Sequence, residues 1–347
     1  MVTGGAGFIG SHTSLILLQN GFDVFIVDSL KNSFPESINR VRKLFKKSNP
    51  HASNRLYFFK EDMCNLHALE KIFKEIYSSG FVIDGVIHFA GYKSVQESIK
   101  NPEIYWINNI KSTLNILNLI KIYKCKKMVF SSSASVYGDN KKIPYFENLV
   151  KNPINPYSET KSFIEDVLEK EVSLINPKLK VASLRYFNPI GAHESGELGE
   201  CSKSGYTNIF PLINKAANNS KFILDLFGND WLTHDGTCIR DYIHVMDLAE
   251  AHINVLDFLN KNDTKILILN IGTGKGTSVL GLINAFEEVN NVKILYRFVS
   301  KRIGDVETVF ANTDLSHKLL NWKAKRTIKD MCLDGWKWFQ KNPDGYY

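Results

Sequence analysis

The chain has 347 residues, 44% of them hydrophobic, and a formal net charge of +7. This length exceeds what one hydrophobic core normally serves, so it predicts two domains or one elaborated α/β domain of a soluble globular protein. The densest basic run, residues 40–47, lies on a predicted helix, which favours a solvated helix face over a nucleic-acid site.

The five cysteines are widely scattered: Cys64, Cys125, Cys201, Cys238 and Cys332. None form the close pairs that a zinc site or a redox motif requires, so we expect free thiols in a reducing compartment and no metal site. No secretory signal precedes the first predicted strand, and no apolar run has membrane-spanning length. The expected protein is therefore cytoplasmic and has neither nucleic acid nor membrane as a partner.

Residues 2–11 have the pattern of a strand end, a glycine turn and the first turn of a helix. Gly4 would permit the tight turn, Gly7 would let a pyrophosphate approach the backbone, and Gly10 would let helix and strand pack closely. The amides of the helix N-terminus would supply the positive end that a diphosphate needs. A glycine turn alone also fits ordinary chain reversal, so this interpretation depends on the rest of the chain. Because little chain precedes Thr3, the first strand is expected to be short.

Apolar, β-rich runs then alternate with amphipathic helical patterns. Strands are predicted at residues 24–27, 56–59, 86–89, 128–131 and 181–184, and helices at 66–76, 104–122 and 157–174. Continuous apolar strands between helices indicate a parallel sheet covered on both faces, a doubly wound, Rossmann-type α/β fold. Ligands of such sheets bind beyond the carboxyl ends of the strands.

After residue 184 the pattern becomes less regular. Residues 185–211 are rich in glycine and polar side chains, as expected of a long binding loop, and a strand at 266–270 is predicted to return to the large sheet. Apolar side chains at helical spacing in 327–339 are interpreted as core anchors. We expect residues 1–187, with a return segment near 236–272, to form a dinucleotide-binding domain. Residues 188–347 would form most of a smaller C-terminal α/β substrate domain.

Polar and small residues follow the ends of several predicted strands. Asp28 ends the second strand, where a carboxylate accepts hydrogen bonds from both ribose hydroxyls and repels a 2′-phosphate, favouring NAD over NADP. Asp62, with the apolar Met63 beside it, fits a partner for the adenine amino group. Residues 89–91 are small enough to let a flat cofactor approach the backbone. An isolated aspartate at a strand end is usually a turn residue, but its distance from the glycine turn favours the cofactor role.

The fifth strand ends in a serine cluster, and the next helix carries Tyr157 and Lys161 four residues apart on one face. An ammonium group and a nicotinamide cation would both stabilise the phenolate and lower its pKa from about 10 toward working pH. Tyr157 would then be a general base for a sugar or alcohol hydroxyl, with Ser133 as the hydrogen-bonding third member. Such a tyrosine–lysine pair is common by chance, whereas the whole ordered set is not.

These motifs resemble those of the extended short-chain dehydrogenases/reductases. The glycine turn at 3–10 together with Tyr157 and Lys161 is the signature of that family, and within it the chain resembles the UDP-glucose (UDP-galactose) 4-epimerases. The resemblance covers essentially the whole chain. It includes residues 88–91, 131–139, 185–193, 227–230, 240–248 and 302–305, several of which are typical of sugar-nucleotide epimerases.

The resemblance implies NAD as the cofactor and a UDP-sugar as the substrate. It implies an NAD site formed by Gly4, Gly7, Phe8, Ile9, Gly10, Asp28, Asn32, Ser33, Asp62, Met63, Phe89, Ala90, Gly91, Lys93, Asn108, Tyr157, Lys161 and Phe187. The hexose would contact Ser133, Tyr157, Tyr186, Asn188 and Val309, and the UDP would contact Asn208, Leu226, Phe227, Arg240, Arg302 and Asp305. A guanidinium group suits bidentate recognition of diphosphate oxygens.

The resemblance also implies reversible 4-epimerisation of UDP-glucose and UDP-galactose through a 4-keto intermediate, a step of galactose metabolism. Ser133, Tyr157 and Lys161 would be the catalytic set, with Tyr157 as acid and base. NAD would be regenerated in each cycle and would stay bound. Relatives often form homodimers through two long helices, which correspond here to residues 104–122 and 157–174.

The motifs do not decide which UDP-sugars are substrates, and they leave alternative activities to consider. Val309 stands where some relatives carry a tyrosine that narrows the hexose pocket, so UDP-GlcNAc and UDP-GalNAc are further candidate substrates. A 4,6-dehydratase would need an Asp-Glu pair after the serine of the fifth strand, where this chain has Ala134 and Ser135. A 4-epimerase of UDP-pentose or UDP-uronate would share the motifs found here. A non-catalytic NAD-binding protein would be expected to lose Tyr157 and Lys161.

Overall fold

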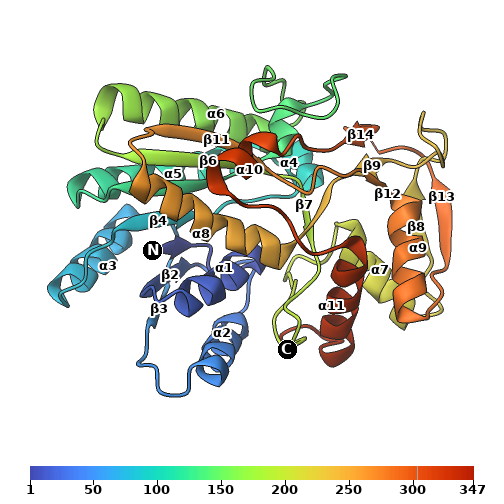
Figure 1. Cartoon of the computed structure of the whole chain (residues 1–347), viewed down its shortest axis with the longest axis horizontal. Coiled ribbons are helices and arrows are strands. Elements are labelled where there is room, and N and C mark those ends of the chain that lie inside the picture. The colour runs from blue at the N-terminus through green and yellow to red at the C-terminus, as the bar shows by residue number, and fades with distance from the viewer. Residues whose placement is uncertain (303) are drawn as a thin grey trace.

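A seven-stranded sheet lies at the centre of the computed structural model, which describes residues 1–302 and 304–347 (Figure 1). The strand order is β11-β6-β5-β4-β1-β2-β3, and every neighbouring pair is parallel. The strands are β1 (Val2–Thr3), β2 (Val24–Asp28), β3 (Leu56–Lys60), β4 (Gly85–His88), β5 (Lys127–Ser133), β6 (Lys180–Tyr186) and β11 (Ile266–Ile271). The predicted parallel sheet is confirmed, including the strand that returns at 266–271 and the short first strand.

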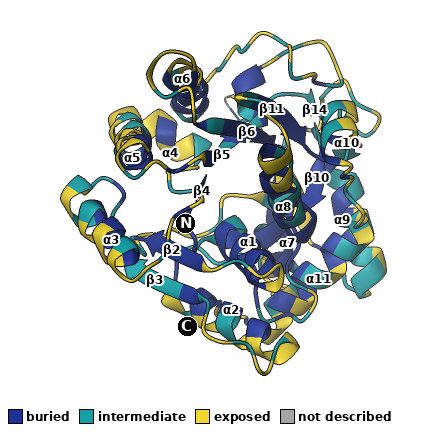
Figure 2. Ribbon diagram, turned by 60° about the vertical axis from the view of Figure 1, so that its left-hand side comes forward, coloured by how far each residue is buried: buried dark blue, intermediate teal, exposed yellow. Residues whose placement is uncertain are grey.

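Helices cover both faces of this sheet. One layer consists of α1 (Phe8–Gln19), α2 (Pro35–Ser48) and α8 (Val245–Lys261), and the other of α3 (Leu66–Ser78), α5 (Pro102–Ile122) and α6 (Pro156–Lys170). Successive strand residues point to opposite faces, so Val129 of β5 packs under the first layer while Met128 and Phe130 pack under the second. Figure 2 shows the buried strands between the partly exposed helices. Shorter elements are α4 (Val95–Lys100), the 3₁₀ turn η1 (Ala134–Tyr137) and the π-helical turn η2 (Glu171–Ile175).

The C-terminal half is built from short strands in three small sheets, on the right of Figure 1. These are β7 (Asn188–Ile190) with β10 (Tyr242–His244), β8 (Leu224–Phe227) with β13 (Tyr296–Val299), and β9 (Ile239–Arg240) between β12 (Thr277–Ser278) and β14 (Thr308–Val309). The helices are α7 (Ile209–Asn218), α9 (Val279–Asn290), α10 (Asp314–Leu320) and α11 (Ile328–Lys341). Met331 and Trp336 of α11 are buried in a second core, as expected of core anchors.

The two halves share buried contacts. Ala192, Leu198, Trp338 and Tyr346 lie in the same core as α1 and α2, so the segment after β7 and the end of the chain pack on the large sheet's first helix layer. All five cysteines are free thiols. Among the described residues, no helix is long and apolar enough to cross a membrane, and no three His, Cys, Asp or Glu side chains are grouped to hold a metal ion.

Candidate active site

The glycine turn connects β1 to α1 at the carboxyl edge of the sheet, where β1 lies between β2 and β4. Gly4 has a φ of +67°, and a Cβ there would lie 2.8 Å from the backbone nitrogen of Ala90. A Cβ on Gly10 would collide with the carbonyl oxygen of Gly4. Only glycine fits these two positions, because three backbone segments meet there. Gly7 is the N-cap of α1 and provides no side-chain cap, so the first amides of α1 are suited to an anion.

Asp28 connects this turn to the loop after β2. Its Oδ2 accepts a hydrogen bond from the Ala6 amide at 3.0 Å, and its Oδ1 accepts from the Leu30 amide at 2.9 Å and the Ser33 hydroxyl at 2.8 Å. The carboxylate is almost fully buried. A carboxylate has about four acceptor positions, so it can accept a further ribose hydroxyl while it holds the turn in place.

The residues predicted to bind adenine, Asp62 and Met63, follow the end of β3. Asp62 accepts from the Cys64 amide at 2.8 Å and pairs with Lys31 at 2.7 Å. The Cys64 thiol lies 3.7 Å from Oδ1 of Asn108 on α5, and the carbonyl of the buried Met63 accepts a hydrogen bond from Asn115, also on α5. The remaining residues of the predicted NAD site at this edge are Phe8, Ile9, Phe89, Ala90 and Gly91.

A segment of the C-terminal half, residues 200–204, crosses to two other predicted cofactor residues. Glu200 pairs with Lys93 at 3.2 Å, and the Asn32 side-chain oxygen accepts from the hydroxyls of Ser202 and Ser204 at 2.7 and 2.6 Å. Lys203 donates to the Leu30 carbonyl at 2.7 Å. Asn32 and Lys93 are therefore joined through this segment.

The three predicted catalytic residues come together at the ends of β5 and α6. Asn155 caps α6 with a capping box and Pro156 occupies its first turn, which fixes Tyr157 at the start of the helix. Ser133 ends β5 close to Tyr157, and its Oγ accepts hydrogen bonds from the Ser135 amide at 3.2 Å and the Ser135 hydroxyl at 2.9 Å. The Lys161 ammonium lies 5.9 Å from the centre of the Tyr157 ring and donates to the Ser131 carbonyl at 2.6 Å.

Burial shifts the ionisation of both catalytic groups. It lowers the pKa of Lys161 to about 8, with the Glu165 carboxylate acting in the opposite direction. Burial also raises the pKa of the Tyr157 phenol, and the hydrogen bond with Ser133 offsets part of this shift. The sequence predicted a lowered pKa for Tyr157. In the chain itself desolvation of the phenolate outweighs the other effects, so the predicted lowering requires an additional positive charge beside the phenol.

The residues predicted to contact the hexose differ in exposure. Tyr186 is buried, and its hydroxyl is 2.7 Å from Nε2 of His252 on α8. Asn188 is exposed at the start of β7. Val309 is partly buried and packs against the hydrophobic cluster that contains Ala134 and Phe187. The hexose-binding roles of these residues stay predictions.

The residues predicted to bind UDP gather around β8, β9 and β14. The Arg302 guanidinium lies 3.6 Å from the centre of the Phe227 ring, and its buried Nε has no hydrogen-bond partner among the described residues. Burial lowers the pKa of Arg302, and Asp305 opposes this shift. A buried, unsatisfied guanidinium N–H fits a ligand that brings an acceptor. Arg240 pairs in register with Val309, whereas Leu226 is fully buried in the second core and Asn208 is exposed at the start of α7.

The sequence interpretation missed two residues behind Lys161. Glu165 and Arg185 form a buried ion pair with N···O distances of 3.0 and 2.7 Å. The signal was available for Glu165, because it follows Tyr157 and Lys161 at the same four-residue interval and so shares their helix face. Arg185 gave no local signal, since only the pairing of β5 with β6 brings it beneath α6.

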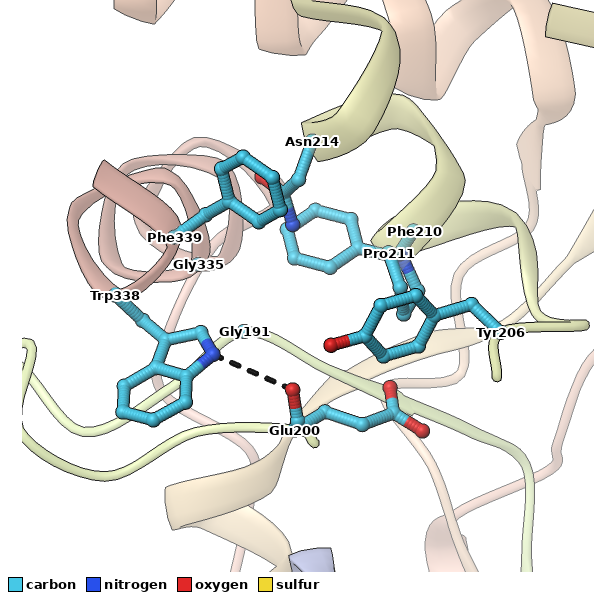
Figure 3. A pocket seen from close by; sticks show the side chains of 9 residues that line it. All are labelled: Gly191, Glu200, Tyr206, Phe210, Pro211, Asn214, Gly335, Trp338 and Phe339. Carbon is cyan, nitrogen blue, oxygen red and sulfur yellow. Dashed lines mark hydrogen bonds between the residues drawn. The ribbon is translucent and has the colours of Figure 1, made fainter. Parts of the chain in front are cut away.

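A separate small cavity lies between α7, α11 and the segment that follows β7 (Figure 3). Tyr206, Phe210 and Phe339 surround it with aromatic rings, and the Trp338 indole donates to the Glu200 carbonyl at 3.3 Å. Ser133, Tyr157 and Lys161 are not among its lining residues. The cavity therefore lies apart from the catalytic cluster.

Comparisons with known proteins give one consistent family. The family model described as GDP-mannose 4,6 dehydratase matches residues 1–334. The bifunctional UDP-glucose 4-epimerase and UDP-xylose 4-epimerase 3 of Arabidopsis thaliana is 44% identical, over 100% of this chain and 96% of its own length.

Two solved structures are similar over nearly the whole chain. UDP-glucose 4-epimerase from Bifidobacterium longum, in complex with NAD+ and UDP, is 40% identical with a TM-score of 0.91, covering 99% of this chain and 98% of that chain. UDP-glucose-4-epimerase from Stenotrophomonas maltophila, with bound NAD and formylated UDP-arabinopyranose, is 38% identical with a TM-score of 0.91 and the same coverage, 99% and 98%.

Proposed function

This chain belongs to the UDP-glucose 4-epimerases, isomerases of the extended short-chain dehydrogenase/reductase type, and we propose that it interconverts UDP-glucose and UDP-galactose. The observation that carries the proposal is the cluster of Ser133, Tyr157 and Lys161 at the ends of β5 and α6, on the sheet edge that also holds the glycine turn. The matched dehydratase family model does not favour dehydration, because Ala134 and Ser135 stand where that reaction needs an Asp-Glu pair.

We propose NAD as the resident cofactor. The turn around Gly4 and Gly10 has room for backbone but not for a Cβ, and it presents the first amides of α1 to a pyrophosphate. Asp28 would hold the ribose and Asp62 the adenine. The two similar structures, which contain NAD, support this assignment. When bound, NAD supplies the hydride chemistry at C4 of the sugar.

Tyr157 is the proposed acid and base. It accepts the proton of the 4′-hydroxyl as C4 is oxidised and returns it after the 4-keto sugar has turned over, while the UDP group stays bound. Ser133 holds the reacting hydroxyl by a hydrogen bond, and the Lys161 ammonium stabilises the phenolate. Arg240, Arg302 and Asp305 are proposed to hold the UDP.

A wider substrate range is proposed from two observations. Val309 packs against the cluster that contains Ala134 and Phe187, and it is smaller than the tyrosine found there in some relatives, which favours UDP-GlcNAc and UDP-GalNAc as further substrates. The bifunctional Arabidopsis thaliana relative supports UDP-pentoses as a second class. We place the reaction in galactose metabolism and in the cytoplasm, which its free thiols support.

We propose a homodimer through α5 and α6, which pack side by side and carry exposed faces in Figure 2. Ile104, Ile107 and Leu114 are 51%, 65% and 48% exposed at helical spacing on α5, and Phe163 of α6 is 43% exposed. Ile107→Glu should convert dimers to monomers, measured by sedimentation, because a buried charge is costly at such an interface. Leu232→Glu changes a 91% exposed loop residue and should leave the oligomeric state unchanged. Monomeric unchanged protein would refute the dimer.

The test of the reaction starts with the absorbance spectrum of the purified protein, which should show bound nicotinamide. Conversion of UDP-galactose to UDP-glucose is then measured without added NAD, followed by UDP-GalNAc and a UDP-pentose. Bound nicotinamide without turnover of any sugar nucleotide would identify a non-catalytic NAD-binding protein. Turnover of UDP-pentose alone would identify an epimerase of that sugar class.

A further inference from the structure

A fully buried ion pair lies directly behind the proposed catalytic lysine. Arg185 of β6 binds Glu165 of α6 through Nε to Oε1 at 3.0 Å and through Nη2 to Oε2 at 2.7 Å. The two side chains are 3% and 2% exposed. Such bidentate pairing fixes the orientation of a carboxylate as well as its charge.

Two further side chains, in addition to Arg185, contact the Glu165 carboxylate. The Ser132 hydroxyl donates to Oε1 at 2.6 Å, and the Lys151 ammonium lies 3.7 Å from Oε2. Arg185 is itself fixed, because its Nη1 donates to the Glu147 carbonyl at 3.0 Å and its guanidinium stacks 4.7 Å from the Tyr137 ring centre. The carboxylate therefore has little freedom to turn toward another cation.

Lys161 is a second lysine close to this carboxylate, in addition to Lys151. Lys161 and Glu165 are four residues apart on α6, the spacing at which a lysine and a glutamate readily pair. Nevertheless the Lys161 ammonium donates to the Ser131 carbonyl at 2.6 Å and lies 4.8 Å from the Phe130 ring centre and 5.9 Å from the Tyr157 ring centre. In a buried site with low effective permittivity, an unrestrained carboxylate would attract this ammonium strongly.

We propose that Arg185 and Ser132 are positioning residues, which hold Glu165 away from Lys161 so that the ammonium stays directed at Tyr157. Glu165 remains near enough to favour the charged form of Lys161. The bidentate pairing with Arg185 thus lets Glu165 stabilise the charge of Lys161 from a distance. It also prevents Glu165 from forming a direct salt bridge with Lys161. The proposal rests on the proposed function in taking Tyr157 as the acid and base.

The ionisable groups around this pair come from each neighbouring element: His88 on β4, Tyr137 on η1, Glu147 and Lys151 before α6, and Tyr186 on β6. Burial lowers the pKa of His88 to about 3 and raises the pKa of Tyr137 to about 12. It also raises the pKa of Tyr186. A titration through the alkaline range should therefore follow the ionisation of Lys161 and Tyr157.

The test uses Arg185→Met in the holoenzyme. The ionisation of Tyr157 is followed by ultraviolet difference spectra against the same protein with Tyr157→Phe added, which needs no turnover. The freed carboxylate should pair with Lys161, so the pKa of Tyr157 should rise, and kcat should fall about tenfold with KM within about twofold. Adding Glu165→Gln removes the competing carboxylate and should return both values toward those of the unchanged protein.

A matched control is Arg326→Met, which breaks a different partly buried ion pair, with Asp247 and Glu250 on α8. It should lower stability without changing the Tyr157 titration. An unchanged Tyr157 titration in folded Arg185→Met would overturn the proposal. If that variant does not fold, Arg185→Lys and Ser132→Ala weaken the restraint more gently and should raise the pKa of Tyr157 less. A shifted titration in a protein that turns over no UDP-sugar would refute the proposed function and leave this inference standing.

Discussion

The two halves of the molecule place their functional groups on different kinds of structure. Ser133, Tyr157 and Lys161 lie on β5 and α6, a seven-residue strand and a fifteen-residue helix packed into the large sheet. Arg240 and Val309 lie on strands of two residues, and Arg302 lies in the segment between β13 and β14. Proton transfer needs fixed geometry, whereas substrate selection tolerates and exploits irregular segments. Variants in the first half should therefore change kcat, and variants in the second half should change KM and specificity.

The largest expected effect tests the first half of this comparison. Tyr157→Phe should lower kcat for UDP-galactose by about 10³-fold, within the range of general acid–base catalysis, with KM changed less than about threefold. Tyr77→Phe is the control. It removes a hydroxyl on α3 that donates a hydrogen bond to the Tyr123 carbonyl, and this variant should keep normal activity. Steady-state kinetics decide between these outcomes, and near-normal turnover of Tyr157→Phe would disprove its assignment.

The next largest effect tests the second half. Arg302→Ala removes a charge-assisted donor, so kcat/KM should fall roughly 10- to 100-fold, mainly through KM. Arg297→Ala is the matched control, because this arginine is 65% exposed and its ion pair with Asp225 lies on the surface of β13. If Arg302→Ala lowered kcat and left KM unchanged, the proposed division between the halves would be wrong.

A smaller effect is expected on specificity. Val309→Tyr puts a larger side chain against the cluster that contains Ala134 and Phe187, so it should lower the rate with UDP-GlcNAc about tenfold relative to UDP-glucose. The comparison uses kcat/KM for both substrates with the unchanged protein and with Val309→Leu as a size control. Equal losses for both substrates would indicate general damage to the site and not a change in pocket size.

The smallest effect concerns stability. The pKa of Lys161 is lowered to about 8 in the folded chain from its ordinary value of 10.5. The unfolded chain therefore binds more protons between pH 8 and pH 10.5, and stability due to this group rises with pH across that window. Lys161→Met removes the cost of burying the ammonium, so its melting temperature should exceed that of the unchanged protein at pH 7. The difference should shrink toward pH 10, as differential scanning calorimetry can check.

The sequence sufficed for the first half of the fold because its signals are local. Strands β2 to β5 are four to seven residues long, each contains an apolar run, and each is followed by a helix or a helical turn. The glycine turn and the Tyr157–Lys161 spacing likewise depend on neighbouring residues. Asp28 could be placed because it ends a recognisable strand at a fixed distance from that turn.

The remainder required the three-dimensional structure. Strands as short as β9, β12 and β14 carry no periodicity, since their pairing is decided by distant residues that meet only after folding. The same holds for Arg185, whose partner is twenty residues away on another element. The burial of Tyr186 against His252 was also not foreseeable, because an aromatic residue at a strand end gives no indication of which layer it faces.

The segment 200–204 has a consequence for slow motions. Its contacts with Lys93, Asn32 and Leu30 lie near the surface, although Glu200 itself is 12% exposed, and each such contact contributes only about 0–1 kcal/mol. These contacts are made by consecutive residues, so they form and break as one unit. Opening the segment therefore costs more free energy than breaking any one of the contacts. The amide protons of this segment should exchange with solvent together, at a rate set by that shared opening. A cofactor beneath it would leave no faster than the segment opens.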